Sequence, residues 1–177
     1  MSEDVIEIQG NLSPEHSKVP LKPFARRQKV KRMGKLLSEA RDITMRDHLT
    51  GLPNTQWFEE ELARRFADAR RQGRGLWVLY ADIDLFKGIN DKHGHLVGDG
   101  VLKAFGAIGS REEEPIARIG GEEFAQVIQD GLDLESVKKI ISRYSLNFRE
   151  KSKEILGDET TLSFGIARLQ EGDTPQT

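Results

Sequence analysis

The chain has 177 residues, of which 37% are hydrophobic and 32% charged, and its formal net charge is −2 at pH 7. This length supports one domain plus a tail. The charge gives no basic footprint for nucleic acid, and the absence of cysteine excludes disulfides and cysteine-ligated metal sites. Because the sequence has neither a membrane-spanning apolar run nor a signal-peptide core, we expect a cytoplasmic protein.

The N-terminal part predicts a tail followed by a helix. Residues 1–25 place three prolines among polar residues, which indicates a flexible tail. Residues 26–46 predict a basic amphipathic linker helix. Its apolar positions recur at coiled-coil spacing: Val30, Met33, Leu37 and Ala40. Two heptads are a short pattern, so a solvated helix and a dimer stalk both fit, and binding of an anionic partner is a third reading.

A helix and a buried strand are expected next. Asn54 can cap a helix with one apolar face. That face consists of Phe58, Leu62 and Phe66. The unbroken apolar run 76–80 then predicts a buried strand, and it leads into Ala81-Asp82-Ile83-Asp84. The strand therefore ends in carboxylates, a common position for metal-binding acids in α/β folds.

The segment 85–99 is unusually rich in Asp, Asn, His and Gly for a core element. Single pairs such as Asn90-Asp91 are explained by a polar loop with caps. A second helix is expected to begin near Gly98. Its apolar residues are Val101, Leu102 and Phe105. We expect it to be short, because Gly106 and Gly109 follow.

Two short strands are expected to meet at Gly120-Gly121-Glu122-Glu123. Ile116 and Ala117 lead into this turn, and residues 124–128 lead out of it. A solvated surface turn is one interpretation of such a sequence. Because adjacent acids repel each other unless a cation or a proton is near, a divalent metal is the other.

The C-terminal part predicts a long amphipathic helix and an alternating strand. The helix positions are Leu134, Val137, Ile141, Tyr144 and Phe148, and the strand positions are Leu162, Phe164 and Ile166. We therefore expect an α/β fold: a palm-like, ferredoxin-related βααββαβ sandwich whose central antiparallel sheet is covered by helices. The N-terminal helix and the tail precede it.

A set of motifs appears in a fixed order along the chain: Asp-Ile-Asp, Phe-Lys, Ile-Asn-Asp, Gly-His, Gly-Asp and Arg-x-Gly-Gly-Glu-Glu-Phe. In these motifs the chain resembles the GGDEF family, the diguanylate cyclases, in the variant with a Gly-Gly-Glu-Glu-Phe signature. Asp47-x-Leu-Thr-Gly-Leu-Pro-Asn also resembles the motif that opens the family's domain. The resemblance implies a GGDEF domain over residues 47–177.

The resemblance also implies a metal site. Asp82, the backbone carbonyl of Ile83 and Glu122 would hold two Mg²⁺ ions, or Mn²⁺, against the triphosphate of GTP. Glu122 is the family's candidate for taking the proton of the attacking 3′-hydroxyl, and metal-assisted alkoxide formation is the alternative. Glu123 would add negative charge behind the metals. Lys87 would bind the substrate and stabilise charge on its phosphates.

Further residues would bind the guanine base. By the resemblance, Asn90 and Asp99 would read the guanine edge, and Phe86 and His95 would belong to the same substrate site. Leaving the buried partners of guanine unpaired would penalise adenine, which favours GTP over ATP. His95 is also compatible with a loop-packing role. For Asp47, we favour a cap or a salt-bridge partner over a catalytic role.

The implied reaction condenses two GTP molecules to cyclic di-GMP and releases two pyrophosphates. Each domain would hold one GTP, so the active species would be a homodimer, with no nucleic-acid or membrane partner. A catalytically weak domain that binds GTP or cyclic di-GMP and signals to a partner is the alternative. A dimerisation module built on the N-terminal helix is a third reading.

Two departures from the family are expected to matter. The family's product-binding motif is Arg-x-x-Asp, whereas this chain has Arg111 and Glu114 at the two ends of that motif. Weak allosteric binding of cyclic di-GMP and a plain charged turn are both compatible with this change. The chain also stops at Thr177, so it apparently lacks the family's usual C-terminal helix.

Overall fold

The computed structural model describes residues 23–110, 115–128 and 131–168. These fall into two compact units, the first ending at Ala40 and the second beginning at Arg41. Residues 1–22 of the predicted tail lie outside the described residues. Arg111 and Glu114 lie outside them as well, and so do residues 169–177, on which the expected lack of a C-terminal helix bears.

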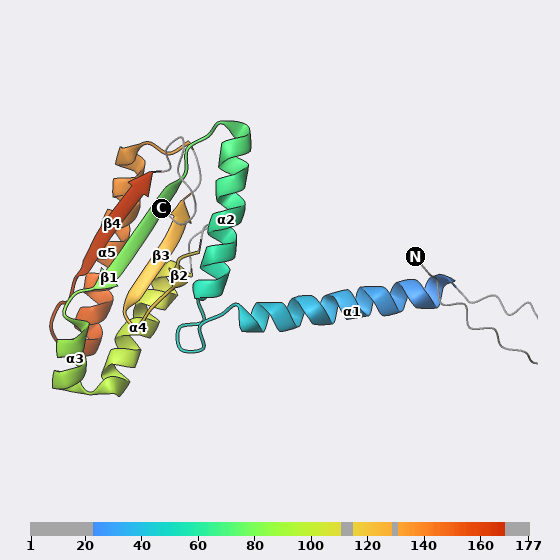
Figure 1. The fold of residues 1–177 in the computed structure, drawn as a ribbon. Coiled ribbons are helices and arrows are strands. Elements are labelled where there is room, and N and C mark those ends of the chain that lie inside the picture. Colours follow the sequence, from blue (N-terminus) through green and yellow to red (C-terminus); the bar gives the residue numbers. More distant parts are fainter. Residues whose placement is uncertain (1–22, 111–114, 129–130, 169–177) are drawn as a thin grey trace, which may run out of the picture. The chain divides into compact units, whose positions relative to one another are not determined.

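Helix α1, Pro23–Thr44, covers most of the range predicted for the linker helix (Figure 1). Between residues 28 and 44, its apolar side chains are open to solvent in this single chain. Those that are more than half exposed between residues 28 and 40 are Val30, Met33, Leu36 and Leu37. A helix that keeps its apolar positions exposed has a face left for another surface to cover.

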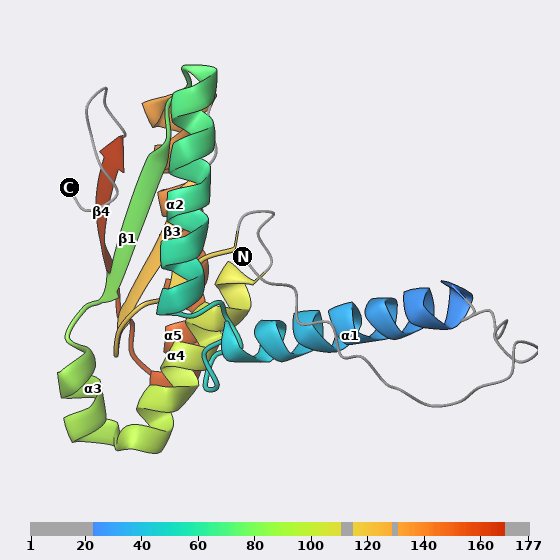
Figure 2. The ribbon, with the colours of Figure 1, turned by 45° about the vertical axis from the view of Figure 1, so that its right-hand side comes forward.

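The second unit is built on a four-stranded antiparallel sheet with the order β2-β3-β1-β4 (Figures 1 and 2). The strands are β1 Trp77–Ile83, β2 Ala117–Arg118, β3 Glu123–Ile128 and β4 Leu162–Arg168. The intervening helices are α3 Phe86–His93, α4 His95–Gly109 and α5 Leu134–Leu156. From β1 onward the element order is βααββαβ, so the predicted palm-like fold is confirmed.

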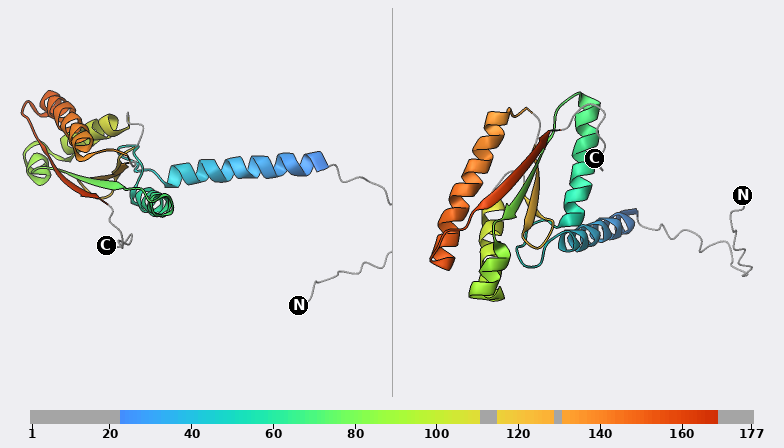
Figure 3. Two further views of the ribbon diagram at one scale, coloured as in Figure 1. Left: turned by 90° about the horizontal axis from the view of Figure 1, so that it is seen from above. Right: turned by 60° about the vertical axis from the view of Figure 1, so that its left-hand side comes forward.

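Helices cover both faces of the sheet. Helix α2, Thr55–Gln72, lies on one face, and α4 and α5 lie on the other (Figure 3). On the α4 side the ring of Phe105 meets the rings of Phe124, Tyr144 and Phe148 at centroid distances of 4.6, 5.8 and 5.4 Å. All four side chains are fully buried, so this aromatic cluster contributes strongly to the core.

The predicted start of α2 is confirmed at the level of atoms. Asn54 Oδ1 accepts a hydrogen bond of 3.1 Å from the backbone N–H of Trp57, as an N-cap does. The helix ends at Gly73, which takes the left-handed conformation. Within the described residues, no helix is both long and apolar enough to cross a bilayer.

The sequence-based interpretation was wrong for residues 85–109. Helix α3 was not located, and α4 begins at His95 and runs to Gly109, so it is not short. Gly106 and Gly109 are buried where α4 packs closely against Thr50 and Ile116. Both therefore allow close contact between segments; Gly106 does not interrupt the helix, which continues to Gly109.

Candidate active site

The register of the sheet brings the predicted acidic residues together. Strands β1 and β3 are antiparallel, and Asp82 faces Glu123 across them. One step further, the backbone N–H of Ile83 donates to the carbonyl of Glu122 at 3.3 Å. Asp82, Ile83, Glu122 and Glu123 therefore meet at one end of the sheet, although about 40 residues separate them in the sequence.

The charges at this end of the sheet repel one another. Partial burial raises the pKa of Asp82 above its ordinary value, and the nearby carboxylates of Glu122, Glu123 and Asp84 raise it further. Such a cluster is relieved by a cation, and oxygen donors of this kind suit Mg²⁺ or Mn²⁺. The donor set therefore fits a divalent metal.

Side chains alone do not form a complete metal cage here. Among the described residues, no group of three or more His, Cys, Asp or Glu side chains is arranged to hold an ion. Charge repulsion acts over longer distances than coordination does, so the two observations agree. A divalent cation bound here would need further oxygen ligands, from the backbone, from water or from a ligand.

Two aspartates of the same motif have different environments. Asp84 accepts hydrogen bonds from the hydroxyls of Thr161 and of Ser163, the latter at 2.6 Å. Its backbone N–H donates to the carbonyl of Thr161 at 3.0 Å. Within the described residues, the Asp82 carboxylate accepts no hydrogen bond. Asp84 therefore anchors the start of β4, a role that sequence reasoning missed, and Asp82 keeps its oxygens available.

Helices α3 and α4 place Asn90 against a glycine. A Cβ atom at Gly98 would lie 2.0 Å from Asn90 Oδ1 and 3.3 Å from Cζ of Phe86, so only glycine leaves room for this amide. Asp99 follows Gly98 directly and is half-buried, as Asn90 is. The structure thus brings Phe86 and Asn90 together at Gly98, and Asp99 is the next residue of α4.

Lys87 and His95 are exposed, each near the start of its helix. In the described part of the chain, neither forms an ion pair or a side-chain hydrogen bond. The backbone of the turn that leads from β1 to Lys87 is strained, because Leu85 has φ +56°. Leu85 is also 87% exposed. Strain of this kind at a non-glycine residue is frequent beside functional sites.

Arg118 is a further residue of this region that sequence reasoning did not single out. Its guanidinium bonds both Asp47 and the carbonyl of Gly121, the residue before Glu122. Burial alone would raise the pKa of Asp47, but bonds from Thr50 and from Arg118 hold it below its ordinary value. The signal was present in the sequence, since Arg118 opens the Arg-x-Gly-Gly motif and Asp47 opens the Asp-x-Leu-Thr motif.

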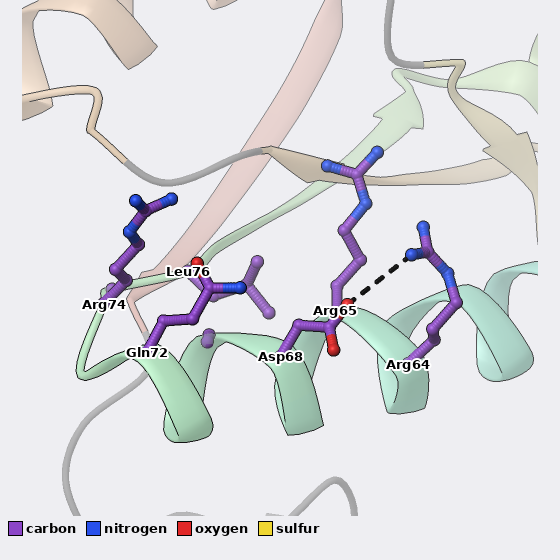
Figure 4. A pocket seen from close by; sticks show the side chains of 8 residues that line it. Arg64, Arg65, Asp68, Gln72, Arg74 and Leu76 are labelled. Carbon is purple, nitrogen blue, oxygen red and sulfur yellow. Dashed lines mark ion pairs between the residues drawn. The ribbon is translucent and has the colours of Figure 1, made fainter.

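Two of the hollows on the surface of this unit differ in their fit to the acidic residues. One, of about 320 Å³, lies between β1 and β4 and includes Asp82 and Glu123 in its lining. The other, of about 290 Å³, lies at the C-terminal end of α2 and contains none of the predicted site residues (Figure 4). Three arginines line it, and Arg64 pairs there with Asp68 at 3.6 Å. We assign the acidic site to the first hollow, because only that one carries the carboxylates.

Comparisons with known proteins agree with this geometry. Residues 44–177 match the family described as "Diguanylate cyclase, GGDEF domain". The chain is 39% identical over 139 residues to diguanylate cyclase TpbB of Pseudomonas aeruginosa, covering 73% of this chain and 31% of TpbB. It thus spans less than a third of that relative's length.

Solved structures give the same result. The GGDEF domain of DgcB from Caulobacter crescentus, in complex with c-di-GMP, aligns with a TM-score of 0.68 and 29% identity, covering 75% of this chain and 80% of that one. A longer DgcB structure with its coiled coil aligns with a TM-score of 0.66 and 26% identity, covering 88% and 85%.

Proposed function

Because the chain belongs to the GGDEF family of diguanylate cyclase domains, we propose that it condenses two GTP molecules to cyclic di-GMP and releases two pyrophosphates. The observation that carries this proposal is the register of β1 and β3, which joins Asp82 to the Glu122-Glu123 turn. Among the described residues, the side chains of these three acids accept no hydrogen bond from the protein. They are therefore available to bind a cation.

Diguanylate cyclases of this family generally depend on a divalent metal. In our proposal, the carboxylates of Asp82 and Glu122 and the carbonyl of Ile83 hold two Mg²⁺ ions, or Mn²⁺ in their place. Bound there, the metal would neutralise charge on the triphosphate and lower the pKa of the attacking hydroxyl. The pKa of Asp82 is raised first by burial and then by the neighbouring carboxylates, and this supports the assignment because a bound cation would stabilise the charged form.

The chain's own groups would orient the substrate and move its proton. Glu122 is our candidate to accept the proton of the 3′-hydroxyl, and Glu123 adds negative charge beside it. Lys87 is exposed at the start of α3, where its ammonium can bind a phosphate oxygen. Holding the reacting groups in line accounts for much of the rate in phosphoryl transfer.

Selection of guanine is assigned to the α3–α4 pair. The amide of Asn90 and the carboxylate of Asp99 have the acceptors and donors that match O6, N1–H and N2–H of guanine. Phe86 and His95 complete this proposed pocket. The contact of Asn90 with Gly98 supports the assignment, because it holds the amide in one place.

Catalysis requires two such domains, since one domain binds one GTP. We therefore propose a homodimer in the cytoplasm, where GTP is found. The exposed apolar positions of α1 support its pairing with the same helix of a second copy. Arg111 and Glu114 are proposed to bind the product weakly, because Glu is longer than the Asp of the family motif.

Incubation with GTP and Mg²⁺, followed by chromatographic detection of cyclic di-GMP, tests the proposal. We expect product with the native chain and none with Glu122→Gln, whose circular dichroism should stay native because the turn is at the surface. Turnover by Glu122→Gln within a few-fold of the native rate would refute the role of this acid.

A further inference from the structure

Arg118 makes an unusually complete set of hydrogen bonds for a residue next to a surface turn. Its Nη1 donates to both carboxylate oxygens of Asp47, at 3.0 and 3.2 Å. Its Nε and Nη2 donate to one carbonyl, that of Gly121, at 3.2 and 2.7 Å. The two charged side chains are only 13% and 15% exposed, so this ion pair is shielded from water.

Asp47 is also held in place by hydrogen bonds that do not involve Arg118. Its Oδ1 accepts from the backbone N–H of Thr50 at 2.8 Å and from the Thr50 hydroxyl at 2.6 Å. Its backbone N–H donates to the carbonyl of Leu52 at 2.8 Å. The backbone N–H of Arg118 donates to Pro53 of the same turn at 2.9 Å. One side of the guanidinium is therefore anchored to the turn 47–53, which is itself held by these hydrogen bonds.

The other end of Arg118 bonds the most adaptable part of the hairpin. Gly120 and Gly121 carry no side chains that limit their conformation. The backbone N–H groups of Ile119 and Gly120 both donate to the carbonyl of Glu123, at 2.9 and 3.3 Å. The carbonyl of Gly121 points instead to Arg118. Residue 122, the next in the chain, carries the proposed metal ligand.

We propose that the Asp47–Arg118 pair is a positioning device, which fixes the Gly121 carbonyl and thereby holds the Glu122 carboxylate at the metal site. Only one premise of this inference comes from the proposed function, namely that Glu122 is a metal ligand. The guanidinium of Arg118 bonds Asp47 and the Gly121 carbonyl, so we assign it a positioning role that acts through the hairpin backbone. The segment that directly follows α1 is in this way part of the catalytic scaffold.

Arg118→Lys is the sharpest test. A lysine keeps the charge, but a single ammonium on a flexible stem cannot bond a carboxylate and a carbonyl in fixed directions. We expect the amides of Ile119 and Gly120 to lose protection from hydrogen exchange in the metal-free protein. We also expect Mn²⁺ affinity, followed by electron paramagnetic resonance, and kcat to fall on the order of 10-fold or more. Discrimination between GTP and ATP should not change.

Asp47→Asn and the double variant test the pairing. If Asp47 acts through Arg118, Asp47→Asn lowers Mn²⁺ affinity in the same direction, and Asp47→Asn/Arg118→Lys loses no more than Arg118→Lys alone. Arg65→Lys is the matched control, because Arg65 pairs with Glu61 at 2.7 Å with side chains 22% and 14% exposed. It should leave both hairpin exchange and Mn²⁺ affinity unchanged.

The two readouts separate the possible failures. Unchanged hairpin exchange in Arg118→Lys would overturn the positioning role, whatever the enzyme does. Native Mn²⁺ affinity in Arg118→Lys, or an equal loss in Arg65→Lys, would overturn it as well. Failure of the native chain to bind Mn²⁺, with hairpin exchange still sensitive to Arg118, would refute the proposed metal site and leave the hold on the hairpin intact.

Discussion

Asp82 lies near the end of β1 and Asp84 directly follows the strand, but the two carboxylates have different environments. Asp84 uses its carboxylate and both backbone groups to hold residues 160–163 at the start of β4. Asp82 has no such partners within the described residues, and its pKa is raised first by burial and then by neighbouring acids. A carboxylate whose charged form is disfavoured in the free protein gains most from a bound cation.

Exchanging the two acids for neutral residues separates structure from binding. Asp82→Asn removes repulsion, so we expect a free energy of unfolding equal to or above that of the native chain and a loss of Mn²⁺ binding. Asp84→Ala leaves two hydroxyl donors without their acceptor and should cost about 1–3 kcal/mol of stability. Urea unfolding and Mn²⁺ titration of both variants measure this. A large loss of stability in Asp82→Asn would contradict the assignment.

Asp47 gives a prediction of pH dependence. Its folded-state pKa is lowered by Thr50 and Arg118, against the effect of burial. Its stabilising contribution is therefore full above the unfolded pKa of about 3.9 and is lost as the pH falls through the lower folded value. The difference in unfolding free energy between the native chain and Asp47→Asn should be constant from pH 7 to about pH 5 and shrink below about pH 4. A difference that grew on acidification would contradict the ion pair.

At the scale of elements, α3 and α4 act as one unit around Asn90. Gly98 lies against the Asn90 amide, and the ring of Phe86 closes the same space. The first turn of α4 therefore limits the position of the Asn90 side chain. Two substitutions in the same helix, both from glycine to alanine, test this arrangement.

Gly98→Ala should act like Asn90→Ala, because a Cβ atom there would lie 2.0 Å from Oδ1 and displace the amide. We expect the GTP requirement to rise and the preference for GTP over ATP to weaken, a loss on the order of 1–3 kcal/mol of selectivity. Gly100→Ala is the control, since its Cβ would meet only Ile155, at 3.9 Å. Competition between GTP and ATP in a binding assay gives both numbers. If both variants prefer GTP over ATP to the same extent, guanine is not recognised at this pocket.

The sequence predicted the hairpin and the strands well, because two glycines between two short, mostly apolar runs favour a hairpin. It did not predict α3. Eight residues with Lys87, Asn90, Asp91 and Lys92 at exposed or half-exposed positions lack the apolar periodicity that marks a helix. Only Phe86 and Ile89 are buried in it, so packing on the core decides its conformation. The salt-bridge role favoured for Asp47 is confirmed, but its partner Arg118 was not identified, since the two residues are 71 positions apart.

The proposed reaction requires two copies of the chain, because it joins two nucleotides whereas one domain offers one set of acids and one proposed base pocket. The exposed residues of α1, Val30, Met33 and Leu37, recur at the a and d spacing of a coiled coil. Pairing through this helix would raise the local concentration of the second domain.

Leu37→Lys should weaken this association, because it puts a charge into the proposed seam. Ser38→Lys, at the next and also exposed position, adds the same charge outside the seam and serves as the control. Sedimentation velocity over a range of protein concentrations should show a higher dissociation constant for Leu37→Lys alone. If both variants self-associate as strongly as the native chain does, α1 is a solvated helix and not the dimer contact.

The proposal that two domains join two GTP molecules is tested by the stoichiometry of the products. With GTP and Mg²⁺, we expect one cyclic di-GMP and two pyrophosphates for every two GTP consumed, at a rate that rises with the square of protein concentration while monomers dominate. Bound GTP that yields no cyclic di-GMP, or that yields only GDP and phosphate, would contradict it.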